Sequence, residues 1–547
     1  MGTGKKPGSL IEAELKNFKV RRPDVLSSLQ QVELLEEKTV LKLHPKAKSD
    51  LKEIADNGLL SYKKNGAAKK YPPFKVGILF SGGPASGGHN IIAGLYDALK
   101  ELNGESQVIG IMNGADGLIK ADAKVLTVQD IDSIRNQGGF YLLGTSRTKV
   151  EKKESFDACL STIKKLELDG LLVAGGDDSN TNAAHLAARV KKEGLNCSVI
   201  GIPKTIDGDL AYPPYLETSF GFYTAARTYS EMVGNICRDL PSSRKIWHFV
   251  KLMGRSASWI TLETAFQTQP NIALIGEEIK EKGLTISEII DEICEVVLKR
   301  HKAGKKYGIV LIPEGIVEFI PEIKGLIKKV NAAIVKIGND EFMKMCLQAR
   351  REVILVELDE STQRLFASLP QEVQNGLLCG LDPHGNVQVS QIASEVLIMD
   401  LVCQKLEKQG IKLTTQTHFY GYDGRCGYPT VFDATYTYNL GRAASLLVAS
   451  KKSGYLVSLN NLSADVSEWK ALALPLAGMM SVEERKGKES LVISKYLVDL
   501  RSKAFLEFSS LREKWALEDS YLCPGPIQYW GPKELVEAKS VTMQLNC

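Results

Sequence analysis

The chain lacks the features that would mark a nucleic-acid-binding, membrane or secreted protein. Its 547 residues carry 69 Lys+Arg against 65 Asp+Glu, a formal net charge of only +4, so a strong basic excess is absent. No apolar run approaches the ~18–20 residues that span a bilayer, and residues 1–18 have no apolar signal region. We expect a cytoplasmic protein that binds neither nucleic acid nor membrane.

Paired cysteines are absent as well. The ten cysteines are scattered singly and none forms a C-x-x-C pair, which argues against a zinc site or a dithiol redox site. Free thiols in a reducing compartment are the expected state.

Three common nucleotide-binding signatures are missing. No Gly-Lys pair is followed by Ser or Thr, no G-x-G-x-x-G follows a predicted strand, and no H-R-D or D-F-G set occurs. The common P-loop, Rossmann dehydrogenase and protein kinase classes are therefore disfavoured.

What is present is an alternation of short apolar runs and amphipathic helices. Runs such as FKVGILF, LLVAGG and YGIVLIPEG end in polar or glycine-rich loops. This pattern predicts an α/β protein with parallel sheets covered on both faces, in which ligands bind beyond the carboxyl ends of the strands.

We expect two Rossmann-like lobes that face a cleft. Residues 1–72 form an N-terminal extension, and residues 73–240 form the first lobe, completed by part of 415–547. Residues 241–414 form the second lobe, with a helical insertion at about 320–410. Residues 415–547 supply a further loop and return to the lobes.

Three loops at strand ends suggest phosphate chemistry. The glycines of residues 81–88 allow close backbone approach to an anion, although a tight turn explains them equally well. Asp177 and Asp178 stand together, which suits a Mg²⁺ ion or, alternatively, a helix cap. In residues 203–209, Thr205, Asp207 and Asp209 would point the same way in an extended segment, as a base near a hydroxyl requires.

These loops together resemble the phosphofructokinase family. The strings GILFSGGPASGG, GTSRT, AGGDDSNT, PKTIDGD, KLMGR, PEG and GYDGR occur in the family's order, from about Lys75 to about Arg425. The chain is most similar to the long, pyrophosphate-dependent branch. That branch catalyses a glycolytic reaction: reversible, Mg²⁺-dependent phosphoryl transfer from pyrophosphate to the 1-hydroxyl of D-fructose 6-phosphate, which gives fructose 1,6-bisphosphate and phosphate.

The resemblance implies roles for individual residues. Asp207 would be the general base, with Thr205 and Ile206 beside it in the substrate-contacting segment. Asp177 would hold Mg²⁺, and Gly82 would contact pyrophosphate. The sugar phosphate would be bound by Met253, Gly254, Arg255, Glu314, Tyr422, Asp423, Gly424 and Arg425.

Four further positions concern the donor and the assembly. ATP-using relatives usually carry Gly at the positions of Asp178 and Lys204, so these two residues imply pyrophosphate as donor. Arg147 would meet the transferred phosphoryl group. Lys245 and Ile246 would reach the site of a neighbouring subunit in a homodimer.

Two alternatives stay open. The chain could be an ATP-dependent 6-phosphofructokinase, which the Asp178 and Lys204 pair argues against. It could also be a non-catalytic regulatory subunit, which would be expected to lose Asp207 or Asp177.

Overall fold

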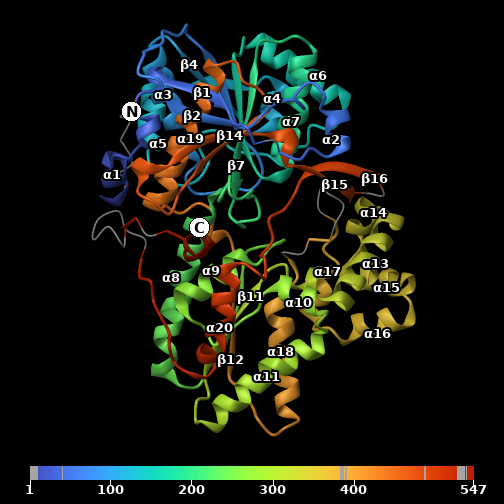
Figure 1. The fold of residues 1–547 in the computed structure, drawn as a ribbon. Helices are drawn as coiled ribbons and strands as arrows, with labels where there is room; N and C mark the ends of the chain where they lie inside the picture. The colour runs from blue at the N-terminus through green and yellow to red at the C-terminus, as the bar shows by residue number, and fades with distance from the viewer. Residues whose placement is uncertain are drawn as a thin grey trace, which may run out of the picture.

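The computed structural model describes residues 10–39, 41–381, 387–388, 391–485, 488–526, 536–537 and 539–546. These residues form two lobes, each built on its own β-sheet (Figure 1). The nine cysteines among them are free thiols, as the sequence predicts. No helix in these ranges is long and apolar enough to cross a membrane.

The upper lobe contains a large sheet with a parallel centre and antiparallel edges. The order along it is β1-β2-β14-β13-β7-β6-β3-β4-β5, and β8 pairs with β7. The parallel centre is β13 (Tyr455–Asn460), β7 (Ser198–Thr205), β6 (Gly170–Gly175), β3 (Lys75–Phe80) and β4 (Gln107–Ile111). The remaining strands are β1 (Val32–Glu36), β2 (Leu60–Lys64), β5 (Ala123–Val125), β8 (Phe220–Gly221) and β14 (Lys470–Pro475).

Helices cover both faces of this sheet, because its strands are apolar on both sides. Ile78 and Leu172 face one hydrophobic core, whereas Leu79 and Leu171 face another. The first core includes α3 (Gly88–Leu102), α5 (Val128–Ile134) and α19 (Val431–Ala449). The second includes α2 (Pro45–Asp50), α4 (Ala115–Lys120), α6 (Lys153–Lys165) and α7 (Asp177–Lys192).

Helices α3 and α19 pack closely enough to require glycine at their contact. A Cβ atom on Gly94 would lie 1.9 Å from the carbonyl oxygen of Tyr438, and one on Gly441 would lie 2.2 Å from that of Ile91. This close packing brings α19, which is more than 300 residues away in the chain, against the helix that follows the glycine-rich loop.

The lower lobe contains a four-stranded parallel sheet in the order β10-β11-β9-β12. Its strands are β9 (Trp247–Leu252), β10 (Ile272–Ala273), β11 (Gly308–Pro313) and β12 (Thr415–Tyr420). One face shares the first core with α8 (Phe222–Ser243), α9 (Trp259–Thr268) and α20 (Lys503–Leu517). The other face packs on α10 (Gly276–Lys282), α11 (Ile286–Lys302), α13 (Pro321–Ile337) and α18 (Ser394–Glu407).

Helices occupy the stretch for which the sequence predicts a helical insertion. Besides α13 and α18 they are α12 (Ile316–Phe319), α14 (Asn339–Lys344), α15 (Leu347–Glu357), α16 (Glu360–Ser368) and α17 (Gln371–Leu377). Helices α13 to α17 form a block at the side of the lower lobe (Figure 1).

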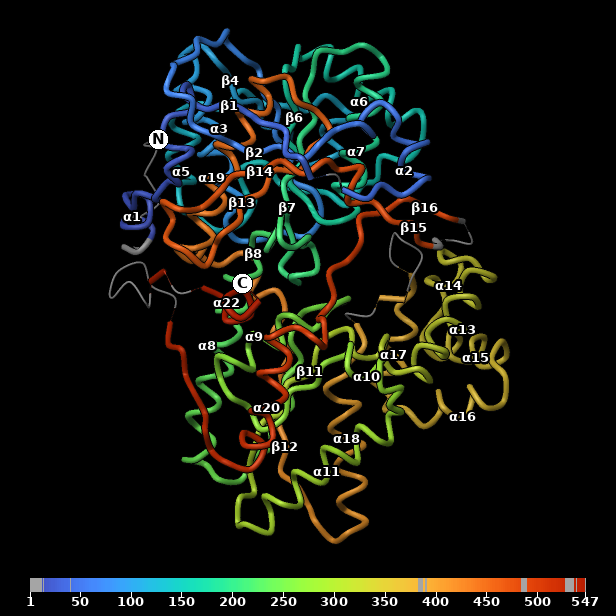
Figure 2. The backbone as a smooth tube through the Cα atoms, viewed as in Figure 1, coloured from blue at the N-terminus to red at the C-terminus, as the bar shows by residue number. Residues whose placement is uncertain are grey.

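Both ends of the chain contribute to the lobes. Besides α1 (Leu10–Asn17), the region expected as an N-terminal extension supplies β1 and β2 at one edge of the large sheet. After β14, the hairpin of β15 (Met480–Arg485) and β16 (Lys488–Ile493) packs on α7. The chain then runs down to α20 and ends at α22 (Val541–Asn546), which lies between the lobes (Figure 2). The domain boundaries stated above stay a prediction.

Candidate active site

The glycine-rich loop joins β3 to α3 at the carboxyl end of the large sheet. Gly82 has a φ of +85°, which suits glycine. Its N–H donates to the carbonyl oxygen of Ser146 at 2.9 Å, and Thr145 Oγ1 donates to its carbonyl oxygen at 2.8 Å. These bonds place the G-T-S-R segment, with the exposed Arg147, directly beside the loop.

Asp177 and Asp178 occupy the first turn of α7, immediately after β6. The partial positive charge of a helix N-terminus stabilises carboxylates there. In the same turn, Ser179 Oγ donates to Ser81 Oγ at 2.8 Å, which ties this turn to the start of the glycine-rich loop. The two loops predicted to bind the phosphoryl donor therefore adjoin one another.

Lys204 lies near the end of β7, and its side chain reaches under the glycine-rich loop. It is only 7% exposed, and its Nζ donates to the carbonyl oxygen of Gly83 at 2.8 Å. Burial lowers the pKa of Lys204 to about 8, although the nearby charge of Asp207 acts in the opposite direction. The lysine ammonium is thus held beside the loop that would contact the donor.

The T-I-D-G-D segment bends where the sequence predicts an extended chain. Strand β7 ends at Thr205 and residues 206–208 form a bend, with Gly208 at a φ of +74°. The expectation of an extended segment is therefore wrong, although the side chains of Thr205 and Asp209 do meet. Thr205 Oγ1 accepts the N–H of Asp207 and donates to Asp209 Oδ1, each at 3.1 Å. The side chain of Ile206 packs in the core.

Both carboxyl groups of this bend hold protons more tightly than usual. Burial and the charge of Glu314 raise the pKa of Asp207. The backbone N–H of Arg255, which donates to Asp207 Oδ2 at 3.3 Å, acts in the opposite direction. Burial and the charge of Asp207 raise the pKa of Asp209 to about 7. A carboxyl group with a raised pKa suits proton transfer near neutral pH.

Two loops of the lower lobe meet opposite this bend. Met253, Gly254 and Arg255 follow β9, and Glu314 follows β11. The N–H of Gly315 donates to the carbonyl oxygen of Gly254 at 3.2 Å. Burial raises the pKa of Glu314, although the charges of nearby basic side chains act to lower it. The side chain of Met253 is buried in the core and contributes little exposed surface.

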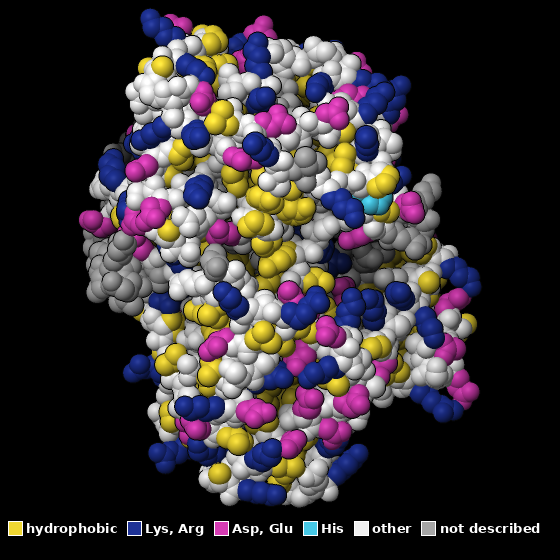
Figure 3. All heavy atoms as spheres, in the orientation of Figure 1, with side chains coloured by type: hydrophobic (Ala, Val, Ile, Leu, Met, Phe, Trp, Pro, Cys, Tyr) yellow, Lys and Arg dark blue, Asp and Glu magenta, His cyan; other side chains and the backbone are white. Residues whose placement is uncertain are grey.

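The G-Y-D-G-R loop links the lower lobe to the glycine-rich loop. Tyr422, Asp423 and Gly424 form a short 3₁₀ turn after β12, and the Arg425 guanidinium lies 4.5 Å from the centre of the Tyr422 ring. A Cβ atom on Gly83 would lie 3.5 Å from Arg425 Cζ. Arg425 therefore reaches the glycine-rich loop of the upper lobe. Figure 3 shows a recess between the lobes, with Lys and Arg side chains along its lower side.

Lys245 and Ile246 are not brought to this site. They precede β9, and therefore lie at the amino end of the strand whose carboxyl end leads to Met253. Six residues of extended strand separate the two ends by about 20 Å. Any contact of Lys245 with substrate would have to be made at another subunit's site.

Lys495 is a residue of this site that the sequence analysis missed. It follows β16, and its Nζ lies 3.9 Å from Asp209 Oδ2. Burial acts to lower the pKa of Lys495, but the charges of Asp177 and Asp209 outweigh it and the pKa is raised. No motif surrounds Lys495 in the sequence, so only the fold reveals its place among the carboxylates.

The donor atoms available suit a magnesium ion that is held partly by phosphate. Among the described residues, no group of three or more His, Cys, Asp and Glu side chains is arranged to hold a metal ion by itself. Mg²⁺ is usually bound through one or two carboxylates together with water and substrate phosphates. Asp177, at a strand end beside the glycine-rich loop, fits that mode of binding.

The chain resembles known proteins over nearly its whole length. The family profile described as Phosphofructokinase matches residues 75–448. The pyrophosphate–fructose 6-phosphate 1-phosphotransferase of Porphyromonas gingivalis is 45% identical over 540 residues, which cover 96% of this chain and 97% of that one. The protein of the same name from Entamoeba histolytica is 45% identical over 475 residues, which cover 86% of this chain and 87% of that one.

Solved structures share the fold at much lower identity. The pyrophosphate-dependent phosphofructokinase from Nitrosospira multiformis superposes with a TM-score of 0.53 at 16% identity, covering 85% of this chain and 97% of that one. The one from Marinobacter aquaeolei gives a TM-score of 0.52 at 15% identity, covering 82% and 93%. Given this fold, the profile match and relatives at 45% identity, the chain belongs to the phosphofructokinase family.

Proposed function

We propose that the chain catalyses reversible phosphoryl transfer from pyrophosphate to the 1-hydroxyl of D-fructose 6-phosphate, giving fructose 1,6-bisphosphate and orthophosphate. The observation that carries this proposal is the position of Asp207. Asp207 is half-buried, its charge interacts with those of Lys204 and Glu314, and its carboxyl group accepts the backbone N–H of Arg255. The names of the relatives at 45% identity agree with this reaction.

In the proposed step, Asp207 is the general base. Its carboxylate accepts the proton of the sugar 1-hydroxyl as the oxygen forms a bond to phosphorus. The bond from that phosphorus to the bridging oxygen of pyrophosphate breaks at the same time, and orthophosphate leaves. The raised pKa of Asp207 supports this role, because a base works best when its pKa lies near the working pH.

The charged groups around Asp207 would stabilise the phosphoryl transfer. When bound, Mg²⁺ would neutralise charge on the phosphates, and Asp177 would be its protein ligand. Lys204 would neutralise the departing phosphate, with Gly82 and Arg147 on the same side of the site. Arg425 would bind the 6-phosphate, because the planar donor fork of arginine matches phosphate oxygens.

The sugar would be bound by the loops of both lobes. Thr205 would contribute its hydroxyl and backbone to the sugar site, and Ile206 would contribute its backbone. The rest of the sugar-phosphate site would be Met253, Gly254, Arg255, Glu314, Tyr422, Asp423 and Gly424.

The choice of donor would rest on Asp178 together with Lys204. A carboxylate near the place of a nucleotide α-phosphate would repel it. Two like charges ~4 Å apart cost about 4 kcal/mol at an effective dielectric constant near 20. Pyrophosphate has no third phosphate in that place, so it would escape this repulsion.

The test is an assay with purified protein, fructose 6-phosphate and Mg²⁺, in which either pyrophosphate or ATP is the donor. We expect fructose 1,6-bisphosphate only with pyrophosphate, and the reverse reaction when orthophosphate is added to fructose 1,6-bisphosphate. Turnover with ATP alone would refute the proposed donor. Replacing Mg²⁺ with a chelator should abolish the reaction.

We also propose a cytoplasmic homodimer whose subunits complete each other's sites through Lys245 and Ile246. The position of both residues at the far end of β9 supports this assembly. Mixing an inactive Asp207→Asn protein with an inactive Lys245→Ala protein should restore activity in mixed dimers. Sedimentation of a monomer at assay concentrations would contradict the proposal.

A further inference from the structure

Lys495 is a charged residue of the active site to which the proposed reaction gives no task. It belongs to residues 494–498, an interlobe segment that leaves β16 in the upper lobe and runs to the lower lobe (Figure 2). We propose that Lys495 is a further catalytic residue, whose ammonium binds oxygen atoms of the phosphoryl group that leaves pyrophosphate for the sugar. This inference rests on the proposed function. Lys495 neither gains nor loses a proton while the phosphorus exchanges the bridging oxygen for the sugar oxygen.

The start of the interlobe segment is tied to the carboxylate-bearing parts of the upper lobe. Ile493, the last residue of β16, donates its N–H to Thr181 Oγ1 at 3.1 Å, and this hydroxyl donates to the carbonyl oxygen of Asp177 at 2.8 Å. On the other side of the lysine, the N–H of Tyr496 donates to the carbonyl oxygen of Asp209 at 2.8 Å. The lysine is therefore anchored from both sides to the segments that hold these two carboxylates.

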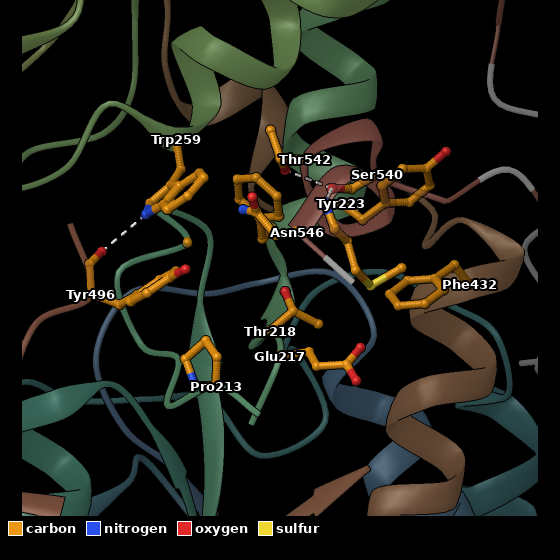
Figure 4. Close-up of a pocket in the computed structure, with 13 residues that line it drawn as sticks. Pro213, Glu217, Thr218, Tyr223, Trp259, Phe432, Tyr496, Ser540, Thr542 and Asn546 are labelled. Carbon is orange, nitrogen blue, oxygen red and sulfur yellow. Dashed lines mark hydrogen bonds between the residues drawn. The ribbon is translucent and has the colours of Figure 1, made fainter. Parts of the chain in front are cut away.

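The end of the interlobe segment is tied to the lower lobe. The ring of Tyr496 stacks on that of Trp259, with ring centres 5.1 Å apart, and the indole N–H donates to the carbonyl oxygen of Tyr496 at 3.0 Å (Figure 4). The N–H of Val498 donates to Glu277 Oε1 at 3.0 Å, and the same oxygen accepts the N–H of Ser258 at 3.1 Å. Ser258 and Trp259 stand at the start of α9, just after the K-L-M-G-R loop. The interlobe segment thus joins the two lobes at the active site.

The ammonium of Lys495 has donors to spare for a ligand. Its Nζ donates to Ser256 Oγ, and Ser256 directly follows Arg255 of the sugar-phosphate loop. Asp209 Oδ2 lies 3.9 Å from the same nitrogen, beyond hydrogen-bond range. Within the described part of the chain, Ser256 is the one acceptor that this ammonium reaches, whereas an ammonium has three N–H donors. Because the side chain is also 32% exposed, phosphate oxygens can take the remaining donors.

The surroundings of Lys495 keep it positively charged. Burial acts to lower its pKa, but the charges of Asp177 and Asp209 outweigh this effect and raise the pKa. Lys204, which lies near the same carboxylates, instead has a pKa lowered to about 8 by burial. A permanent cation beside the expected Mg²⁺ ligand and the proposed base, Asp207, stands where negative charge gathers on the phosphoryl group, so it would stabilise the transition state.

Calorimetry of pyrophosphate binding tests the contact, on the full-length protein with Mg²⁺ and without fructose 6-phosphate. We expect Lys495→Ala to bind pyrophosphate about tenfold more weakly than the wild type, the usual loss for one hydrogen bond between charged groups. Lys503→Ala, at an exposed position further along the same chain segment, should bind as the wild type does. Equal affinities of Lys495→Ala and the wild type would refute the contact. Absence of binding to the wild type would refute pyrophosphate as the donor, and with it the proposed function.

Chemical rescue separates the charge of Lys495 from its packing. Lys495→Ala removes three methylene groups and the ammonium, and propylammonium supplies the same atoms from solution. We expect propylammonium to raise kcat/KM for pyrophosphate about tenfold in Lys495→Ala and to leave the wild type unchanged. The uncharged 1-propanol should have no effect on either protein. Equal effects of the two compounds on Lys495→Ala would refute the role of the ammonium, even where turnover by the wild type confirms the proposed function.

Discussion

The backbone N–H of Arg255 donates a hydrogen bond of 3.3 Å to Oδ2 of Asp207. Asp207 follows a strand of the large sheet and Arg255 follows a strand of the small one. The proposed base is thus oriented from the opposite lobe. The relative positions of the two lobes therefore determine whether the Asp207 carboxylate faces the substrate.

Replacing Asp207 with Asn removes the base but preserves its shape. We expect kcat to fall by about 10²–10⁴-fold, the usual contribution of a positioned base. The KM of fructose 6-phosphate should change much less, since the amide can still accept the N–H of Arg255. Steady-state kinetics in both directions measure this, and a kcat within tenfold of the wild type would show that another group is the base.

The alkaline pH dependence should report Lys204. Its pKa is lowered to about 8 by burial, so the ammonium is charged below that pH and neutral above it. We expect kcat/KM for pyrophosphate to fall as the pH rises through about 8. In Lys204→Arg the charge persists to higher pH, so the fall should move upward. Identical alkaline limbs in both proteins would contradict the role of Lys204.

Lys495 should matter through its charge. Lys495→Met removes one of the two lysine charges near Asp209 and Asp177, which raises the pKa of Asp209 further. We expect kcat/KM to drop tenfold to a hundredfold, corresponding to about 1.5–3 kcal/mol for a charged hydrogen-bonding group. The acid limb of the pH profile should also move to higher pH. Lys495→Arg should restore both kcat/KM and the position of the acid limb. If it restores neither, Lys495 acts through packing and not through its charge.

The stability of the lower lobe should fall on acidification through His248. Its Nδ1 lies 2.8 Å from His418 Nε2, and burial and the charge of His418 lower the pKa of His248 to about 4. An unfolded histidine takes up its proton near pH 6.5 whereas this one does not, so stability is lost between about pH 6.5 and 4. Urea unfolding should show the wild type losing about 1 kcal/mol more than His248→Gln between pH 7.5 and 5.5. Equal losses of stability in the wild type and in His248→Gln would show that His248 does not cause the acid sensitivity.

The sequence predicts the parallel sheets and the loops at their ends because both depend on local patterns. An apolar run that is buried on both faces must be a covered strand, and parallel strands bring their carboxyl ends to one edge. Asp177, Lys204 and Asp207 come together for this reason. Arg255, Glu314 and Arg425 face them because the same rule holds in the second lobe.

Other features depend on contacts that no local pattern encodes. Gly208 adopts a positive φ, so the segment after β7 bends and the side chain of Ile206 turns into the core. Strand β2 joins the large sheet by pairing with β14, some 400 residues further along the chain, and β1 pairs with β2. Lys495 arrives from the far end of the chain with no motif around it. Such long-range placements follow from packing of the whole fold.

The choice of phosphoryl donor is the central claim, and the ratio of kcat/KM for pyrophosphate to that for ATP tests it most directly. It should be measured in the wild type, in Asp178→Gly and in Asp178→Asn, which removes the charge but keeps the size. Electrostatic exclusion predicts a fall in this ratio in both variants, by up to about a thousandfold if the full ~4 kcal/mol of repulsion is released. An unchanged ratio in both variants would contradict the claim that the carboxylate of Asp178 excludes ATP.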